Sequence, residues 1–562
     1  MPTPSWPAIL RHGCFWGLLA LALAVHVADF PPRYQLRNLD ERPYVEGGFA
    51  LWEGITPTYK YSPAGPQTWI SWGFAAVESA RDYFQPSPRQ QSAPFVLRPF
   101  MAGSRALFDL YHDWSIPRWV EVGANVAIAI AAVAAGFGLG FKRGGLPGAL
   151  LVGGLTAFLP IFIDLGDEAR PYVMAWGMGI IALYYSASSP TSRASPRASA
   201  VWMGLSIATR IDMVLLFPLA LADLWEPGER VVLRLGRLVR YVVIALVVMQ
   251  LVSPWVLTNL VGNLRIIATV RLAEPATGPV PISQTIYNVM IGQGLIVAIL
   301  LVAAAVIWAQ PPRVWLQRGV AVYALLLALT MLKATEWGLQ HQGGPLVVLI
   351  VASGIGAAAA AARWPRWVWP AVAVGVILPA FQTARFVLDR RDYVPAPSTE
   401  WVNTHVVPGT RVYMSEGIHD PLPTRVASDA LWNEVADPDA WMKKESNALQ
   451  RFSSATSDFP RAFSEENMIV ERGIRREWFI LGDDDSSDPR FDIRVFTESP
   501  VFGIKADPAS IEAAYKSTGG ILIAPANYDD ALGPPIIEWL NSKGDGVRIY
   551  CSSPSFLIPS PH

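Results

Sequence analysis

The sequence is poor in charge and in cysteine. Only 16% of its 562 residues are charged, against about 25% in soluble globular proteins. The net charge is −1, which excludes a broad electrostatic attraction to nucleic acid, so we expect no nucleic-acid partner. The two cysteines, Cys14 and Cys551, lie at opposite ends of the chain, and we expect no disulfide between them. The sequence also lacks any Cys/His spacing typical of a metal site.

Apolar sequence, by contrast, is abundant: 52% of the residues are apolar and the mean hydropathy is +0.30. Repeated apolar runs of about 18 residues or more predict a polytopic α-helical membrane protein. The first run could also be the apolar part of a signal peptide. We expect an uncleaved first span because many runs follow, and both alternatives export the segment after it. The runs lie at 14–28, 119–141, 145–165, 171–188, 199–224, 241–261, 289–309, 319–335, 344–362 and 367–387.

Basic clusters in the short connections orient these runs, because cytoplasmic loops are enriched in Lys and Arg. All clusters can face the cytoplasm only if 199–224 crosses out and back, although it is too short for two full spans. Two short helices that meet at a polar apex around Arg210 satisfy both constraints. We therefore expect about 11 transmembrane helices, a cytoplasmic N-terminus and, from the Arg-rich inner loops, a bacterial inner membrane. The endoplasmic reticulum is the alternative.

Composition divides the chain into two regions. Residues 1–388 form the predicted transmembrane domain, with a large first exported loop at 31–117. Residues 389–562 form a predicted soluble α/β domain on the same exported, periplasmic side. Aromatic and proline-rich sequence in the first loop predicts a helix over 67–84 along the membrane surface, and a second over 96–111.

The C-terminal region carries alternating strand and helix signals. Helical patterns cover 508–516 and 535–542. The acidic run 483–488 is typical of a solvated loop, with a calcium site as the alternative. Short apolar strands are predicted at 410–414, 478–481, 520–524 and 547–550.

Polar residues on the predicted exported face carry the functional argument. Adjacent Asp40 and Glu41 are costly at a membrane face unless they contact water, a cation or a reacting hydroxyl. A carboxylate within hydrogen-bond reach can deprotonate a hydroxyl acceptor. Arg or Lys can neutralise a phosphate leaving group. Together with Lys60 and Arg210, these carboxylates form the equipment for transfer from a lipid-linked phosphate.

Several short motifs resemble one family. Asp40-Glu41 with Tyr44 downstream is followed by KYSP at 60–63, EARPY at 168–172 and GLSIATR at 204–210. The start of the C-terminal region, from Trp401 to VPGTRVY at 407–413, also fits. In this order they resemble the GT-C fold membrane glycosyltransferases, in the group that includes protein O-mannosyltransferases and the lipid A aminoarabinose transferase.

The resemblance implies a polyprenyl-phosphate sugar donor, inversion at the sugar, and a lipid, glycan or protein acceptor in contact with membrane lipids. It implies that Asp40 is the base and that Lys60 and Arg210 contact the donor phosphate. Glu41 and Glu168 would orient the acceptor or bind a divalent cation, Mg²⁺ or Mn²⁺. The sugar, the acceptor and any metal requirement stay open. Further candidates for substrate binding are Tyr44, Tyr61, Asp167, Arg170 and His341.

Simpler interpretations compete with each role. Glu168 could form only a local ion pair with Arg170, and Asp212 could neutralise Arg210. Lys60 could snorkel at the interface, and His341 could occupy a polar turn without a catalytic role. For the whole chain, the alternatives are a transporter or flippase, or a non-enzymatic subunit of a cell-envelope polymer assembly system. Transporters commonly show internal repeats with charges at mid-membrane, and this sequence shows neither.

Overall fold

The protein is described here from a computed structural model, and all structural statements concern the residues it describes. Outside these ranges lie the predicted helix 96–111 and the acidic run 483–488. The described residues are 12–29, 42–52, 64–81, 115–187, 194–225, 230–258, 282–309, 314–331, 342–391, 401, 405–407, 410–414, 476–480, 515–516, 519–525, 534–540 and 546–557.

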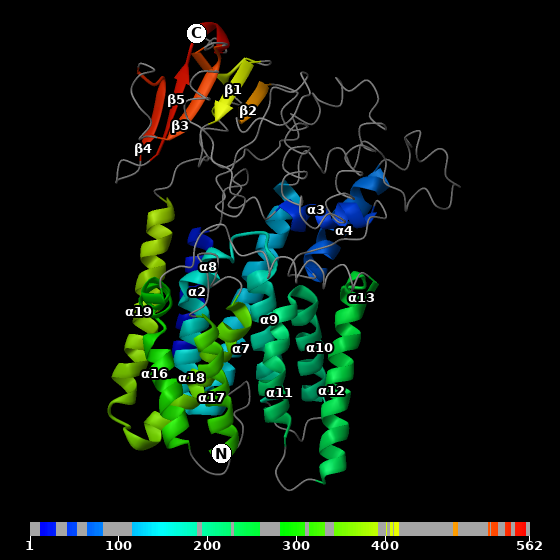
Figure 1. The fold of residues 1–562 in the computed structure, drawn as a ribbon, viewed down its shortest axis with the longest axis vertical. Coiled ribbons are helices and arrows are strands. Elements are labelled where there is room, and N and C mark those ends of the chain that lie inside the picture. Colours follow the sequence, from blue (N-terminus) through cyan, green and yellow to red (C-terminus); the bar gives the residue numbers. More distant parts are fainter. Residues whose placement is uncertain are drawn as a thin grey trace, which may run out of the picture.

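A bundle of roughly aligned helices makes up most of the described chain, and a small sheet lies beyond one end of it (Figure 1). Three described helices are long and apolar enough to cross a membrane: Ile116–Phe158, Gly343–Arg363 and Val368–Leu388. The expected count of 11 transmembrane helices and the domain boundary at 388 stay predictions. The helical elements are α2 (Gly13–Asp29), α3 (Arg42–Trp52), α4 (Gly65–Arg81), α7 (Ser115–Phe158), α8 (Pro160–Asp164), α9 (Pro171–Ser186), α10 (Ala194–Thr209), η4 (Ile211–Leu216), α11 (Phe217–Leu224), α12 (Val231–Val252), α13 (Trp255–Thr258), α15 (Ile282–Tyr287), η5 (Asn288–Gly292), α16 (Ile296–Trp308), α17 (Val314–Met331), α18 (Gly343–Arg363) and α19 (Val368–Arg391).

Helix α7 is a hairpin of two helices that reverse at Gly145, whose φ of 62° is favourable only for glycine. Its two arms touch through backbone: a Cβ on Gly140 would lie 2.2 Å from the carbonyl oxygen of Gly148. The two apolar runs predicted at 119–141 and 145–165 are therefore consecutive antiparallel helices joined by a very tight turn.

The stretch predicted to cross out and back folds as a broken pair of helices, and its path through a membrane stays a prediction. Helix α10 ends at Thr209, Arg210 adopts an extended conformation, and the short η4 leads into α11. At the apex, the amide of Ala64 donates to the carbonyl of Thr209 at 3.2 Å. We call this the apex end of the bundle. At the other end, Asp223 of α11 pairs with Arg143 next to the α7 turn, and we call this the basal end.

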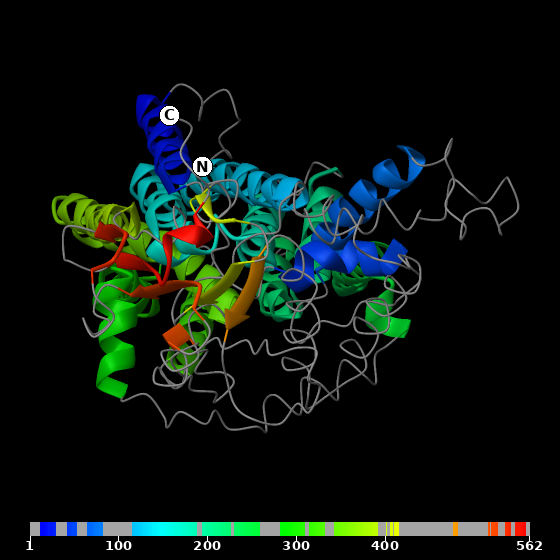
Figure 2. The ribbon, with the colours of Figure 1, turned by 90° about the horizontal axis from the view of Figure 1, so that it is seen from above.

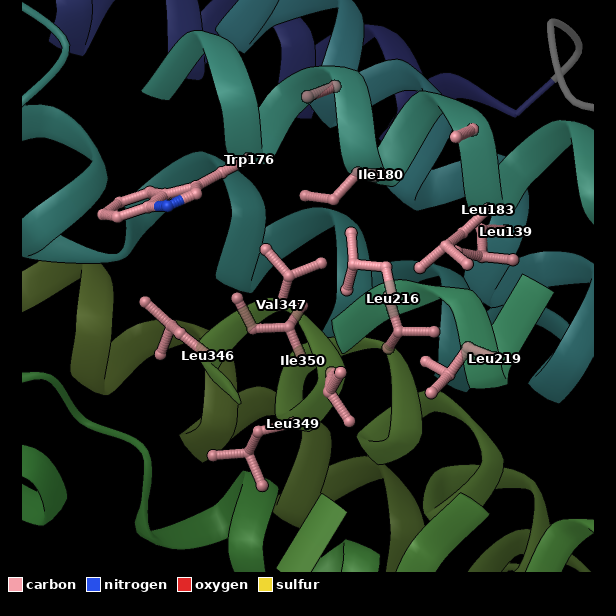
Figure 3. Close-up of a cluster of buried hydrophobic side chains, with 14 of the residues drawn as sticks. Leu139, Trp176, Ile180, Leu183, Leu216, Leu219, Leu346, Val347, Leu349 and Ile350 are labelled. Atoms are coloured by element: carbon pink, nitrogen blue, oxygen red, sulfur yellow. The ribbon is translucent and has the colours of Figure 1, made fainter. Parts of the chain in front are cut away.

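Apolar side chains from α7, α9, η4, α11 and α18 meet in the core between the two ends (Figure 3). Trp176 and Ile180 of α9 face Leu216 of η4 and Val347 of α18, and these four side chains are at most 1% exposed. Helix α18 is buried almost along its whole length because α7, α16 and α17 surround it. This packing holds α9 and the broken pair in a fixed relation.

Small residues allow α16 and α18 to approach closely, as expected for the run 356–362. A Cβ on Gly356 would lie 2.0 Å from the carbonyl oxygen of Leu301, so a larger residue would push the two helices apart.

Helices α3 and α4 pack on each other at the apex end, and α4 also contacts α7 and α10 (Figures 1 and 2). The helix predicted over 67–84 is thus present as α4. Its place relative to a membrane surface stays a prediction.

The sheet has the strand order β2-β1-β3-β5-β4, with parallel pairing on both sides of β1 and antiparallel pairing of β3, β5 and β4. All four predicted strands are present. The helix predicted over 535–542 is wrong, because residues 537–540 form β4. Pairing of Trp539 with Val547 along β5 outweighs the local helical pattern. The strands are β1 (Thr410–Met414), β2 (Arg476–Ile480), β3 (Ile521–Pro525), β4 (Ile537–Leu540) and β5 (Gly546–Cys551).

Two further predictions bear on the C-terminal region and the cysteines. Of the helix predicted over 508–516, only Tyr515 and Lys516 are described, and both are helical. Cys14 and Cys551 are both free cysteines in the structure.

Candidate functional site

Buried charge gathers at the apex end. The turn between α8 and α9 carries Asp167, Glu168 and Arg170, which are only 2 to 4% exposed. Burying a charged group in apolar surroundings is costly unless the group is paired and hydrogen-bonded. The charged groups of this turn therefore need partners among the residues that surround it.

Arg170 is engaged on two edges and one face. It donates from one terminal nitrogen to Glu168 Oε2 at 3.1 Å and from the other to the Tyr172 hydroxyl at 3.1 Å. Its guanidinium carbon lies 4.7 Å from the centre of the Tyr172 ring. The expected alternative of a local Glu168–Arg170 ion pair is thus present. Because both side chains are at most 5% exposed, the pair is buried rather than on the surface.

Arg210 approaches the same ring from the broken pair. Its guanidinium carbon lies 4.2 Å from the centre of the Tyr172 ring, and its Nε–H donates to Asp212 Oδ1 at 2.9 Å. Tyr44 of α3 is among the groups that interact electrostatically with this guanidinium. Among the described residues, Asp212 is the hydrogen-bond acceptor for Nε only, so the two terminal amino groups of Arg210 keep their donors for another partner.

Two cations therefore share one aromatic ring, in the order Glu168–Arg170–Tyr172–Arg210–Asp212. Cation–π contacts in desolvated surroundings are stronger than on a surface, at about 2 kcal/mol. Arg is the side chain best suited to bind phosphate because its planar fork presents several donors at once. Each of the two cations is balanced by a carboxylate, and the terminal N–H donors of Arg210 are the groups that could bind an oxyanion at this end of the bundle.

The first arm of α7 supports the turn from behind. Arg118, Glu121 and Asn125 lie on one face of this arm and are fully buried. The Asn125 amide donates to the carbonyl oxygens of Glu168 at 2.7 Å and Arg170 at 3.0 Å. These three residues were not among the predicted site residues. Their i, i+3 and i+7 spacing at the start of an apolar run is the signal that could have identified them.

Helices α4 and α2 lie on two further sides of the turn between α8 and α9. Gln67 of α4 is fully buried and donates from Nε2 to the sulfur of Met174 at 3.4 Å. Ala64, which precedes α4, has a φ of 47°, an uncommon left-handed conformation for a residue with a Cβ. On the other side, a Cβ on Gly166 would lie 3.1 Å from the His26 ring, so the end of α2 lies next to the turn.

The structure brings several of the predicted site residues together and does not describe others. Glu168, Arg170 and Arg210 are connected through Tyr172. Tyr44 lies near Arg210, and buried Asp167 belongs to the same turn as Glu168. Outside the described residues lie Asp40, Glu41, Lys60, Tyr61 and His341, and their roles stay predictions.

Tyr172 and Asp212 are functional candidates that the prediction of site residues did not include. Tyr172 ends the EARPY motif, but only the fold shows that two cations meet on its ring.

A divalent cation stays a prediction. Within the described part of the chain, no group of three or more His, Cys, Asp or Glu side chains could hold a metal ion. Glu41, one of the two carboxylates proposed for such a site, lies outside that part, as does the proposed base Asp40.

Comparisons with known proteins were made by sequence and by structure. No protein-family model and no curated protein matches the chain. ArnT from Cupriavidus metallidurans is similar in structure, both in the apo state and bound to undecaprenyl phosphate. Each of these two structures has 13% identity and a TM-score of 0.43 over 98% of this chain, and the match covers 99% and 100% of the respective ArnT chains.

The archaeal oligosaccharyltransferase AglB from Archaeoglobus fulgidus, in complex with an inhibitory peptide and a dolichol-phosphate, is also similar. It has 11% identity and a TM-score of 0.39 over 78% of this chain and 60% of its own. TM-scores below 0.5 do not establish a shared fold, so the resemblance to the GT-C fold glycosyltransferases rests on the sequence motifs. At these identities and TM-scores the matches assign no residue role and no substrate to this chain.

Proposed function

We propose that this protein is a membrane glycosyltransferase that moves a sugar from a polyprenyl-phosphate carrier to an acceptor at the apex end. The observation that carries the proposal is the pair of buried guanidinium groups, Arg170 and Arg210, on the ring of Tyr172. Cations are expensive in an apolar bundle, and intramembrane ionisable residues usually mark a functional site.

A phosphate on a lipid tail fits both the unused donors of Arg210 and the apolar helices that lead to them. Its oxygens would accept hydrogen bonds from the terminal amino groups of Arg210, and its tail would lie along the apolar helices. The charge of the phosphate grows as the bond to the sugar breaks, so fixed cations stabilise the transition state more than the ground state.

In the transfer step, the acceptor oxygen attacks the anomeric carbon as the bond from that carbon to the phosphate oxygen breaks. The phosphate leaves with the electron pair, and the proton of the acceptor passes to the base. A direct displacement of this kind inverts the configuration at the sugar. Asp40 is the proposed base, with Glu41 and Glu168 orienting the acceptor or binding a cation, and Lys60 assisting Arg210 at the phosphate.

Chain connectivity supports the role of Asp40. Residues 30–41 connect the end of α2, next to the turn, with the start of α3, which carries Tyr44. Asp40 precedes Tyr44 by four residues, and four residues span at most about 14 Å. Tyr44 is an electrostatic neighbour of Arg210, and this short separation along the chain supports the proposed role of Asp40.

The test is carrier binding and transfer by the purified full-length protein in lipid nanodiscs. Native mass spectrometry measures binding of undecaprenyl phosphate, the ligand in one of the ArnT structures. Loss of labelled sugar from a panel of polyprenyl-phosphate sugars, with a membrane extract as acceptor source, measures transfer. Asp40→Asn is expected to bind the carrier normally and to lose transfer by at least about 100-fold.

The control is Glu78→Gln, which removes a carboxylate from α4 at the same end and is expected to retain transfer. Wild-type transfer by Asp40→Asn would exclude this residue as the base. Carrier binding without loss of sugar from any donor would favour a flippase, and no carrier binding at all would favour a non-enzymatic subunit.

A further inference from the structure

The turn that carries Glu168 and Arg170 has an irregular backbone inside the bundle. The turn lies between the end of α8 at Asp164 and the start of α9 at Pro171. Its carbonyl groups are therefore outside the regular hydrogen-bond pattern of either helix. Backbone polar groups in such surroundings need partners, because no bulk water is present to satisfy them. The conformation of this turn therefore depends on side chains of other elements.

Asn125 supplies two of these partners. An amide group carries two N–H donors, and both are used: one on the carbonyl of Glu168 at 2.7 Å and one on the carbonyl of Arg170 at 3.0 Å. Because both partners are pure acceptors, only the nitrogen side of the amide can face them, and the orientation of the amide is determined. Asn125 itself is fully buried on the first arm of α7.

The two carbonyl groups that Asn125 binds belong to Glu168 and Arg170, on either side of Ala169. The side chains of these two residues are part of the charged cluster around the cation pair, which we define as Arg170 and Arg210. Glu168 is ion-paired with Arg170, and Arg170 contacts Tyr172, over which Arg210 also lies. A change in the backbone at 168–170 would therefore move the first cation relative to the second.

We propose that Asn125 is a positioning residue that sets the spacing of the two arginines by clamping the backbone on both sides of Ala169. It acts through the turn and touches no reacting atom. This proposal rests on the proposed function only for its kinetic consequence, since the clamp itself is a property of the fold. A phosphate held by two cations needs both at the correct distance, and small displacements in such sites cause large losses of rate.

The test of the clamp uses a thiol at Ala169, which is fully buried. In the full-length protein with Cys14→Ser and Cys551→Ser, Ala169→Cys is expected to react slowly with N-ethylmaleimide. Adding Asn125→Leu keeps the volume of the side chain but removes both donors. Loss of two buried hydrogen bonds is expected to raise the labelling rate about tenfold.

The matched control is Ser199→Ala in the same background. Ser199 is fully buried and donates to the carbonyl of Ala182 at 2.8 Å, so its loss removes a hydrogen bond between helices far from the turn. Labelling at position 169 is expected to proceed at the same rate as in the Ala169→Cys protein that retains Asn125 and Ser199. An equal rise in this control would show general loosening of the bundle and would overturn the proposal.

Transfer kinetics give a second and separate readout. Asn125→Leu is expected to lower kcat/KM for the lipid-linked donor about tenfold and to leave KM for the acceptor unchanged. If Asn125→Leu does not reach the membrane, Asn125→Asp is the second variant, because it retains the shape but cannot supply both donors. Unchanged labelling overturns the clamp in either variant. Faster labelling in the Asn125 variant, together with no transferase activity in the wild-type protein, would confirm the clamp and reject the proposed function.

Discussion

The two ends of the bundle use buried ion pairs in opposite ways. At the apex end, each arginine pairs with a carboxylate two residues away: Arg170 with Glu168 and Arg210 with Asp212. At the basal end, Arg143 next to the α7 turn pairs with Asp223 of α11, which is 80 residues away in sequence. Local pairs cannot hold distant elements together, whereas the basal pair does.

The remaining contacts sharpen this difference. Asp223 also accepts a hydrogen bond from Ser186 at 2.9 Å, so one carboxylate ties α7, α9 and α11 together. Lys142 lies 3.5 Å from the centre of the Tyr184 ring and donates to the Tyr184 carbonyl. At the apex end, in contrast, the guanidinium faces lie on Tyr172 and leave donors of Arg210 unused within the described residues. The ion pair at the basal end therefore stabilises the packing of α7, α9 and α11, whereas Arg210 at the apex end retains donors that can bind a ligand.

The largest expected effect is the loss of a cation at the apex end. Arg210→Gln should weaken binding of undecaprenyl phosphate or slow transfer about 100-fold, because it removes a fixed charge from the developing oxyanion. The thermal unfolding midpoint should fall as well, because the variant loses the contacts of Arg210 with Asp212 and with the Tyr172 ring, so binding and transfer are compared at a temperature at which both proteins are folded. Titration of the carrier into the purified variant, with a parallel thermal melt, measures both. Wild-type binding and transfer would remove Arg210 from the site.

The reciprocal change at the basal end should affect stability instead. Asp223→Ala leaves Arg143 without its carboxylate, in a place where the two side chains are 9% and 16% exposed. The free energy of unfolding should fall by about 2 kcal/mol, less than for a fully buried pair because some solvent reaches it. Denaturant unfolding in detergent measures the loss. Carrier affinity should be unchanged, and a loss of affinity as large as that in Arg210→Gln would contradict the division between the two ends.

Substitution of Tyr172 separates the ring from its hydroxyl. Tyr172→Leu removes the aromatic face shared by both arginines and should weaken carrier binding about tenfold. Tyr172→Phe retains the face and loses only the hydrogen bond from Arg170, so binding should weaken by no more than about threefold. Carrier titration of both variants measures the difference. Equal losses would show that the hydroxyl, and not the ring, is the important feature.

The smallest expected effect is at Ser186. Ser186→Ala removes one of the two hydrogen bonds to Asp223 while the ion pair with Arg143 remains. The free energy of unfolding should fall by about 1 kcal/mol, and transfer should not change. Combination with Asp223→Ala should add nothing further, because the acceptor is then already missing. Denaturant unfolding of the single and double variants tests this, and additive losses would contradict the contact.

Much of the architecture could be predicted because it depends on local pattern. Apolar runs located most of the helices, and the basic clusters on either side of 199–224, at Arg193/Arg197 and from Arg230 to Arg240, required a broken pair there, which the structure contains. The strand at 410–414 followed from its apolar residues. The error at 535–542 shows the limit: the local pattern favours a helix, but pairing with β5 supplies hydrogen bonds that only the folded chain offers.

The site could be predicted only in part, for a similar reason. Arg170 and Arg210 were recognisable because charges in apolar sequence are costly. That both lie on Tyr172 was not recognisable, because a cation–π contact depends on the approach of two helices and leaves no spacing in the sequence. Asn125 could have been noticed from its helical spacing with Arg118 and Glu121, but that spacing does not indicate which backbone groups its side chain binds.

By itself, the sequence determined the helical membrane character of this protein and which residues are too polar to be buried without a reason. It did so because hydropathy and charge are properties of single residues and short windows. Only the tertiary structure decided which of these residues meet: the cation pair on Tyr172, the clamp from α7 and the basal ion pair each join segments that are distant in sequence. Such contacts arise from packing of whole helices, and no local pattern encodes them.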